Sequence, residues 1–407
     1  MIIFLILSSI FFLFYFKYHK ETGIGPLLIF FLSFFLLFLF VFEYAMTRID
    51  FFISDELYYI NFESGKAVQD NSRLLWLQIN EWILNDDISL DKFVLKIINI
   101  PIAAGLLLLL WFMYDKNRKI FLLVLILPYL PFLATKNLRD IAILFVAALA
   151  ISSFHSQKPL HVLISMFSLV ALFFLRPFAA FFIIVIFLAQ LAYLFVKYVT
   201  ELKVQKVFAK KIFLLLLVLL ILLPGALVTV ESRITQYFDQ FIYATGEGLD
   251  ARTEGRVGSN EFYNSGNTGR DFIIASVRYV FTPMPFSFFL RVLYGERTEW
   301  GLLDDIVRLL NQVMYYILLC YILINARFIW DAFRQISLSG KTFICYLLTY
   351  WPIYSFYLYG VSHQRLKLPF QIAIFLLSLA IYEQKRRSQL KHEKIRADFK
   401  FKKEVMI

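Results

Sequence analysis

Two adjacent carboxylates, Asp55 and Glu56, stand between the apolar residues Phe51–Ile53 and the aromatic pair Tyr58–Tyr59. Burial beside a membrane raises the pKa of a carboxyl group, which makes a carboxylate an effective proton acceptor near neutral pH. The pair therefore suits proton abstraction from a hydroxyl group. A plainer interpretation is that the two acids lie in the first turn of a short helix that Ser54 caps.

Basic side chains gather in short connections between apolar segments. One connection ends in Lys136, Arg139 and Asp140, and another consists almost entirely of Arg176, which precedes Pro177. Charges at the end of a membrane-crossing helix are costly unless they are paired or functional. Because a guanidinium group binds phosphate through two parallel hydrogen bonds, these turns predict a site for a phosphate group. Alternatively, Asp140 caps the helix that follows and the two arginines reach lipid headgroups.

A third connection brings His363, Arg365 and Lys367 together just before the last apolar segment. Three potential cations on one short turn attract an anionic ligand. Two further arginines, Arg256 and Arg270, lie in a Gly-rich stretch, for which the alternative is a flexible connection without chemistry. We predict that all five residues bind the substrate.

The composition indicates that lipid surrounds the segments that carry these residues. Of the 407 residues, 60% are hydrophobic and 17% are charged, whereas about 25% are charged in soluble domains. The 47 Phe and 23 Tyr residues give more apolar surface than a soluble fold can bury. The two cysteines, Cys320 and Cys345, lie in apolar runs without a CxxC or Cys/His motif, so nothing indicates a zinc or redox centre.

The expected fold is an all-α, polytopic bundle of about 11 transmembrane helices, because a span needs about 20 apolar residues. Residues 1–407 then form one membrane domain. The predicted spans are 2–16, 24–46, 93–114, 119–134, 139–154, 160–175, 177–196, 212–230, 308–326, 341–360 and 367–383. Pro128, Pro131 and Pro177 predict broken or tilted helices. The amphipathic run Phe272–Leu293 predicts helices that lie in the membrane interface or re-enter the membrane.

Most of the positive charge lies on one side of this bundle, which the positive-inside rule makes cytoplasmic. About 23 of the 41 Lys and Arg residues fall in connections on that side and in the basic tail 384–407. The N-terminus and the loops 47–92 and 231–307 are then outside, and the tail binds anionic lipid headgroups. Since topology explains the net charge of +11, nucleic acid is not an expected partner.

The charged sites belong to different segments but share the outer face of this topology. A carboxylate that accepts a proton and cations that hold a leaving phosphate suit sugar transfer from a lipid-linked donor. A transporter or flippase of lipid-linked sugars is the alternative from another class. A transporter predicts ionisable groups near the middle of the spans, where this sequence has few.

The order of these elements resembles that of the GT-C membrane glycosyltransferases. Asp55–Tyr59 resembles their acidic motif in the first outer loop, and Lys136–Asp140 resembles a charged turn of bacterial members. Arg176–Pro177 resembles their Arg-Pro pair, and Arg365–Pro369 resembles the Arg-rich turn before a late helix. The resemblance implies a donor linked to polyprenyl phosphate or diphosphate, with Asp55 as general base. Unlike many members, this chain ends in a short basic tail instead of a sizeable soluble domain.

The resemblance further implies that Glu56 is a second base or a ligand of a divalent metal such as Mg²⁺ or Mn²⁺. The large late outer loop with Arg and Gly also resembles bacterial polysaccharide polymerases of the O-antigen and capsule type. Both resemblances imply a multi-pass protein of the bacterial inner membrane that builds surface polysaccharide from a lipid-linked donor and a lipid-linked or glycan acceptor. Transfer of a single hexose is the leading expectation, and joining of whole repeat units is the close alternative. The sugar and the oligomeric state stay open.

Overall fold

The computed structural model describes residues 33, 36–37, 74–83, 95, 98–156, 158–201, 268–281, 284–294, 299–357 and 364–405. Every regular element in these ranges is a helix, so this part of the chain has the all-α fold that the sequence predicts. The longer helices are α4 (Leu74–Ile83), α6 (Asn99–Met113), α9 (Asp140–Phe154), α10 (Pro159–Leu175), α11 (Pro177–Glu201), α14 (Thr268–Phe281), α15 (Pro285–Tyr294), α16 (Glu299–Ile324), α18 (Leu338–Leu348), α19 (Tyr350–Tyr357) and α20 (Gln364–Val405). Shorter turns are η2 (Arg118–Leu122), α7 (Leu123–Ile126), α8 (Tyr129–Ala134), η3 (Ala326–Phe328) and α17 (Ile329–Gln335).

Prolines decide where several of these helices begin and break. Pro159 and Pro177 open α10 and α11, as expected for a residue whose missing N–H costs nothing in the first turn. The segment 119–134 is broken, as its prolines predict, because Pro128 separates α7 from α8 and has no N–H to continue the ladder. The expected span 341–360 is likewise two helices, α18 and α19, with Pro352 in the first turn of α19.

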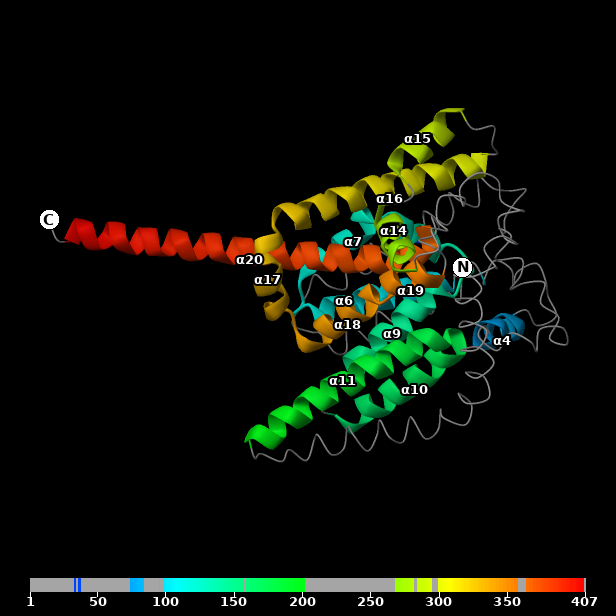
Figure 1. The fold of residues 1–407 in the computed structure, drawn as a ribbon, viewed down its shortest axis with the longest axis horizontal. Coiled ribbons are helices and arrows are strands. Elements are labelled where there is room, and N and C mark those ends of the chain that lie inside the picture. The colour runs from blue at the N-terminus through cyan, green and yellow to red at the C-terminus, as the bar shows by residue number, and fades with distance from the viewer. Residues whose placement is uncertain are drawn as a thin grey trace.

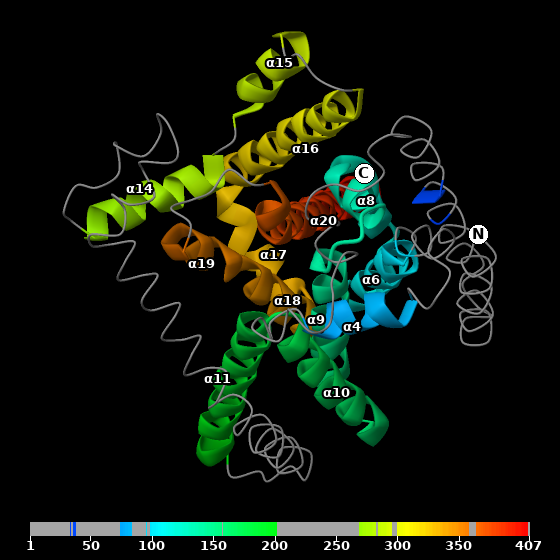
Figure 2. The same ribbon diagram turned by 90° about the vertical axis from the view of Figure 1, so that its right-hand side faces the viewer.

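The core of the bundle forms around α9 and the first half of α20. Figure 1 shows α20 running along the bundle beside α16, and Figure 2 shows it end-on, among α16, α17, α18 and α8. Helix α9 packs between α6 and α10. Its buried alanines permit close approach, and a Cβ atom added to Gly105 of α6 would lie 2.8 Å from the ring of Phe145 on α9. Small residues at such crossings allow the two helix backbones to approach each other closely.

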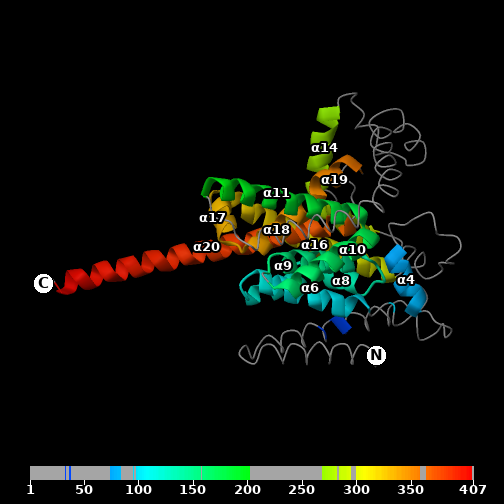
Figure 3. The ribbon, with the colours of Figure 1, turned by 90° about the horizontal axis from the view of Figure 1, so that it is seen from below.

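Contacts between distant segments show that the connections between helices gather at two ends of the bundle. At one end, Lys119 pairs with Glu383, Lys385 donates to the side chain of Asn325 at 2.9 Å, and Ser337 bonds to the carbonyl of Met113. These are the connections that the charge pattern assigns to the cytoplasmic side. Helix α20 continues beyond this end as a single projecting helix (Figures 1 and 3).

Two of the described helices are long and apolar enough to cross a membrane, Leu303–Ile324 and Gln364–Leu390. Both agree with a membrane protein. Shorter apolar helices include α6, α9 and the first residues of α11. Helix α16 begins at Glu299, earlier than the predicted span 308–326, because more than two amphipathic turns precede its apolar part. Helix α14, from the amphipathic run, lies across the bundle axis and not along it (Figures 1, 2 and 3).

Candidate functional site

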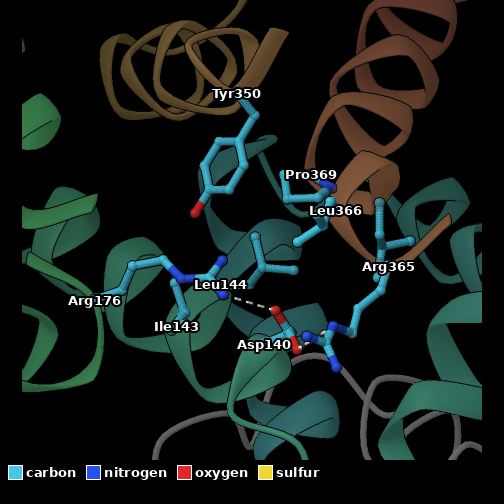
Figure 4. A pocket seen from close by; sticks show the side chains of 9 residues that line it. Asp140, Ile143, Leu144, Arg176, Tyr350, Arg365, Leu366 and Pro369 are labelled. Carbon is cyan, nitrogen blue, oxygen red and sulfur yellow. Dashed lines mark hydrogen bonds and ion pairs between the residues drawn. The ribbon is translucent and has the colours of Figure 1, made fainter. Parts of the chain in front are cut away.

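At the end opposite the projecting helix, one carboxylate joins three separate segments. Asp140 opens α9, and its two oxygens each contact a guanidinium group: Arg176 Nη2 lies 3.3 Å from Oδ1, and Arg365 Nε lies 3.3 Å from Oδ2. Figure 4 shows the carboxylate between the two arginines. We call Asp140, Arg176 and Arg365 the Arg-Asp-Arg cluster. It carries one net positive charge.

Local backbone geometry places each member of this cluster. Asp140 sits in the first turn of α9, but the N-cap residue is Arg139, whose side chain makes no capping hydrogen bond. The capping alternative for Asp140 is therefore wrong. Arg176 is extended, with φ −162° and ψ 98°, as a residue before proline prefers. Its neighbour in space, Arg139, donates from Nη1 to the carbonyl of Leu175 at 2.7 Å and so satisfies a carbonyl that the end of α10 leaves open.

The turn before α9 is tied to α6 by a buried amide. Asn99 Nδ2 donates to the carbonyls of Lys136 and Leu138, both at 2.6 Å. The Lys136 side chain is buried, and its ammonium lies 4.7 Å from the centre of the Phe132 ring. A cation over an aromatic face gains about 0.5–2 kcal/mol, more when water is excluded. Lys136 therefore adds a positive charge inside the protein at this end of the bundle.

Lys367 extends the positive region toward α14. Its side chain is buried, its ammonium lies 5.2 Å from the centre of the Tyr279 ring, and it approaches the carbonyl of Arg278 at 3.5 Å. The Tyr279 hydroxyl donates to the carbonyl of Leu366 at 3.0 Å. The start of α20 thus presents Arg365 to α9 and Lys367 to α14.

A row of tyrosines covers the other side of Arg176. Arg176 Nη1 lies 3.4 Å from the hydroxyl of Tyr354, and the hydroxyls of Tyr346 and Tyr350 are 2.9 Å apart. In Figure 4 the Tyr350 hydroxyl points toward Arg176. Sequence reasoning missed these residues, although their spacing of four places all three on one face of a helical segment.

A second ion pair near the cluster was also missed. Arg308 bonds Asp304 with Nη2 2.7 Å from Oδ2, and the guanidinium carbon of Arg308 lies 5.9 Å from the centre of the Tyr129 ring. Lys136 lies close enough to Asp304 for its positive charge to attract the carboxylate. The Asp-x-x-x-Arg spacing is a sequence signal for a helical pair. It was missed because Asp304 was assigned to the loop 231–307 and Arg308 to the span 308–326.

The cavity at the cluster is small. Its volume is about 10 Å³, about the space that one water molecule needs. Apolar side chains from α9 and α20 close it, among them Ile143, Leu144 and Pro369 (Figure 4). An anion can therefore enter only where a side chain turns aside. Arg365 is best able to do so, because its side chain is 28% exposed, against 10% for Arg176.

The remaining predicted site residues are distributed as follows. Asp55, Glu56, Arg256 and His363 lie outside the described residues. Arg270 is exposed in the first turn of α14, about 13 Å along the helix from Tyr279.

The divalent metal that the resemblance implies depends on Asp55 and Glu56. Within the part of the chain that the structure describes, no three His, Cys, Asp or Glu residues come together as metal ligands do.

The structure thus brings three of the predicted residues into direct contact and places Lys136, Arg139 and Lys367 around them. Comparisons with protein-family models, curated proteins and solved structures find no match to this chain.

Proposed function

We propose that this protein is an integral membrane glycosyltransferase that uses a polyprenyl-phosphate- or polyprenyl-diphosphate-linked sugar donor. The observation that carries the proposal is the Arg-Asp-Arg cluster with two buried lysines near it, all at one end of the helices. Buried cations of this kind stabilise the negative charge that develops on a leaving phosphate. The proposal includes a GT-C-like bundle of about 11 spans in the bacterial inner membrane, with this end of the helices outside.

The charge balance of the cluster supports phosphate binding. Asp140 neutralises one guanidinium group and leaves the second positive charge uncompensated within the cluster. A phosphate group that displaces the Arg365 side chain from Asp140 gains a charge-assisted hydrogen bond. Arg176 stays on Asp140 and keeps α9 joined to the connection between α10 and α11.

The exposed surface supports a lipid environment. Large apolar side chains point outward along several helices, including Phe167 on α10, Phe181 on α11 and Ile317 on α16, each more than half exposed. Soluble monomers rarely expose apolar surface on this scale. The perimeter of the bundle is therefore suited to lipid.

The chemical step is assigned to Asp55, which accepts the proton of the acceptor hydroxyl while that oxygen attacks the anomeric carbon of the donor. The bond from that carbon to the lipid phosphate breaks, and the cations take up the charge of the leaving phosphate. A polymerase that joins whole repeat units would use the same groups with a lipid-linked acceptor.

A buried amide network favours a second candidate, a transporter of lipid-linked sugars. Gln312 accepts from Gln364 at 3.2 Å and from Gln371 at 3.3 Å, and Asn311 donates to Gln371 at 2.9 Å. All four side chains are buried between α16 and α20. Polar groups inside a membrane bundle often line a substrate pathway. The transporter needs no general base.

Substitution of Asp55 by Asn distinguishes the two candidates, because it keeps the shape and removes the base. The enzyme should still bind polyprenyl-linked donor in nanodiscs but lose turnover, whereas a transporter should keep its flux. Asp115→Asn is the matched control: Asp115 lies in the tight turn after α6, with φ 51°, which Asn also tolerates. Unchanged polymer synthesis by Asp55→Asn would exclude the catalytic assignment.

A further inference from the structure

At the end of the bundle from which α20 projects, one turn of α20 holds both ends of the segment formed by η3 and α17. Lys385 Nζ donates to Asn325 Oδ1 at 2.9 Å, just before η3. Arg387 Nη1 donates to Gln335 Oε1 at 3.0 Å, at the end of α17. Helix α17 links α16 to α18 and runs across α20, not along it (Figures 1 and 2). The turn therefore fixes a short helix that lies across the axis of the bundle.

Two more cations lie on this short helix and on its neighbour α18. Lys341 Nζ donates to the carbonyl of Arg334 at 2.8 Å, and that carbonyl belongs to the negative end of α17. The guanidinium carbon of Arg334 lies 4.9 Å from the centre of the Trp330 ring. We call Arg334, Lys341, Lys385 and Arg387 the inner cation cluster. It joins α17, α18 and α20.

The inner cation cluster carries positive charge that its surroundings do not neutralise. Within the part of the chain that the structure describes, its four members bond an amide oxygen, a backbone carbonyl or an aromatic ring. Of the acids nearby, Glu383 pairs with Lys119, and Asp331 is exposed in the first turn of α17. At the opposite end of the bundle, by contrast, both arginines of the Arg-Asp-Arg cluster contact a carboxylate. The inner cations are therefore open to an anionic ligand.

The length of the two long apolar helices puts this cluster at the level of lipid headgroups. From Gln364 to Lys385 α20 rises about 32 Å, close to the thickness of about 30 Å of a hydrocarbon core. The apolar part of α16 ends at Ile324, directly before the segment that the cluster holds. Beyond Arg387, α20 continues in line with the bundle and away from it (Figures 1 and 3). The charge pattern assigns headgroup binding to the whole tail, whereas this geometry favours its first turn.

Apolar side chains beside the cluster suit the same boundary. Trp330 on α17, Leu338 at the start of α18 and Ile324 at the end of α16 are each more than half exposed. Tryptophan is enriched where hydrocarbon meets headgroups, because its ring is apolar and its N–H is polar. Since Arg334 lies over this ring, its guanidinium group is held at that level.

We propose that the inner cation cluster binds the phosphodiester headgroup of an anionic phospholipid, such as phosphatidylglycerol, from the adjacent leaflet. The phosphate oxygens accept hydrogen bonds from Arg334 and Arg387, and the acyl chains lie beside Trp330. The lipid supplies negative charge between three helices whose cations otherwise repel one another, and so it holds α17, α18 and α20 together. The assignment goes beyond the proposed function and does not depend on whether the protein is a transferase or a transporter.

The test titrates the full-length protein in dodecyl maltoside micelles with phosphatidylglycerol and counts bound lipid by native mass spectrometry. Arg334→Gln and Arg387→Gln should each weaken binding about fivefold, which is about 1 kcal/mol. Arg387→Lys keeps the charge and should weaken it less. Lys402→Gln is the matched control, because it makes the same change of charge on the same helix about 22 Å beyond Arg387, and it should leave binding unchanged. Both arginines are exposed, so the variants should keep the size-exclusion profile of the unaltered protein.

Four results would overturn the assignment. Normal binding by both arginine variants would show that the cluster does not hold the lipid. An equal loss in Lys402→Gln would mean that the basic tail attracts anionic lipid without a defined site. Phosphatidylcholine that binds as tightly as phosphatidylglycerol would remove the role of the negative headgroup. If soluble glycerol phosphate displaces phosphatidylglycerol at equal concentration, the cluster takes a soluble phosphate ester and not a membrane lipid.

Discussion

Arg176 and Arg365 contact the same carboxylate at the same distance, yet we predict that the loss of one lowers stability and the loss of the other lowers ligand binding. The two guanidinium groups lie 3.3 Å from the oxygens of Asp140, but the Arg365 side chain is 28% exposed and that of Arg176 is 10% exposed. Solvent screening weakens the Arg365–Asp140 pair more than the Arg176–Asp140 pair, because an exposed ion pair contributes about 0–1 kcal/mol to stability. Breaking a buried pair costs about 3–5 kcal/mol. Arg176 should therefore act on stability, and Arg365 should act on binding.

The expected magnitudes follow from the partners that each substitution leaves behind. Arg176→Gln strands a buried carboxylate on one partly exposed partner and removes the contact to Tyr354, so the free energy of unfolding should fall by about 3 kcal/mol. Arg365→Gln leaves the buried pair intact and should cost about 1 kcal/mol or less. The Arg365 variant should instead weaken polyprenyl phosphate binding about 10- to 100-fold, because a hydrogen bond to a charged group contributes about 1.5–3 kcal/mol.

Arg308→Gln provides the matched control for the Arg365 variant. Arg308 is 29% exposed and pairs with Asp304, but it belongs to a different ion pair from the cluster. Its loss should change stability as little as that of Arg365 and should leave lipid binding much closer to that of the unaltered protein. Stability is read from denaturant unfolding in one detergent, and binding from nanodisc titration with polyprenyl phosphate.

A double-mutant cycle with Asp140→Asn completes the test. The coupling energy of Asp140 with Arg176 should exceed its coupling with Arg365 by about 1–2 kcal/mol. Equal stability losses for the two arginine variants, or normal lipid binding by Arg365→Gln, would refute the division of roles. The first result would mean that burial does not separate the two pairs. The second would mean that Arg365 is a structural residue.

Two further predictions concern the turn before α9 and the topology. Asn99→Leu removes two buried hydrogen bonds to backbone carbonyls and should lower the free energy of unfolding by about 2–4 kcal/mol; a loss below about 0.5 kcal/mol would show that the turn does not depend on α6. Single cysteines at Ser54 and Ser362, in a background without native cysteines, should react with an impermeant maleimide on intact cells, and one at Ser388 should not. Reversed labelling would place the cationic cluster in the cytoplasm.

The sequence determined the helices of this protein in large part. Runs of apolar residues predicted spans at 139–154, 160–175 and 177–196, and the structure has α9, α10 and α11 there. Proline chemistry predicted the break at Pro128 for a local reason, since the missing N–H acts on the residue's own turn. Helix α16 begins nine residues before the predicted span 308–326, because the amphipathic turns ahead of its apolar part carry no strong apolar signal.

The tertiary structure alone decided which charges meet. The sequence marked Asp140, Arg176 and Arg365 as residues at helix ends, but it left capping, headgroup contact and phosphate binding open. Pairing depends on how each helix is rotated about its axis and how far it is shifted along its neighbours. Those quantities are fixed by side-chain packing between segments distant in sequence.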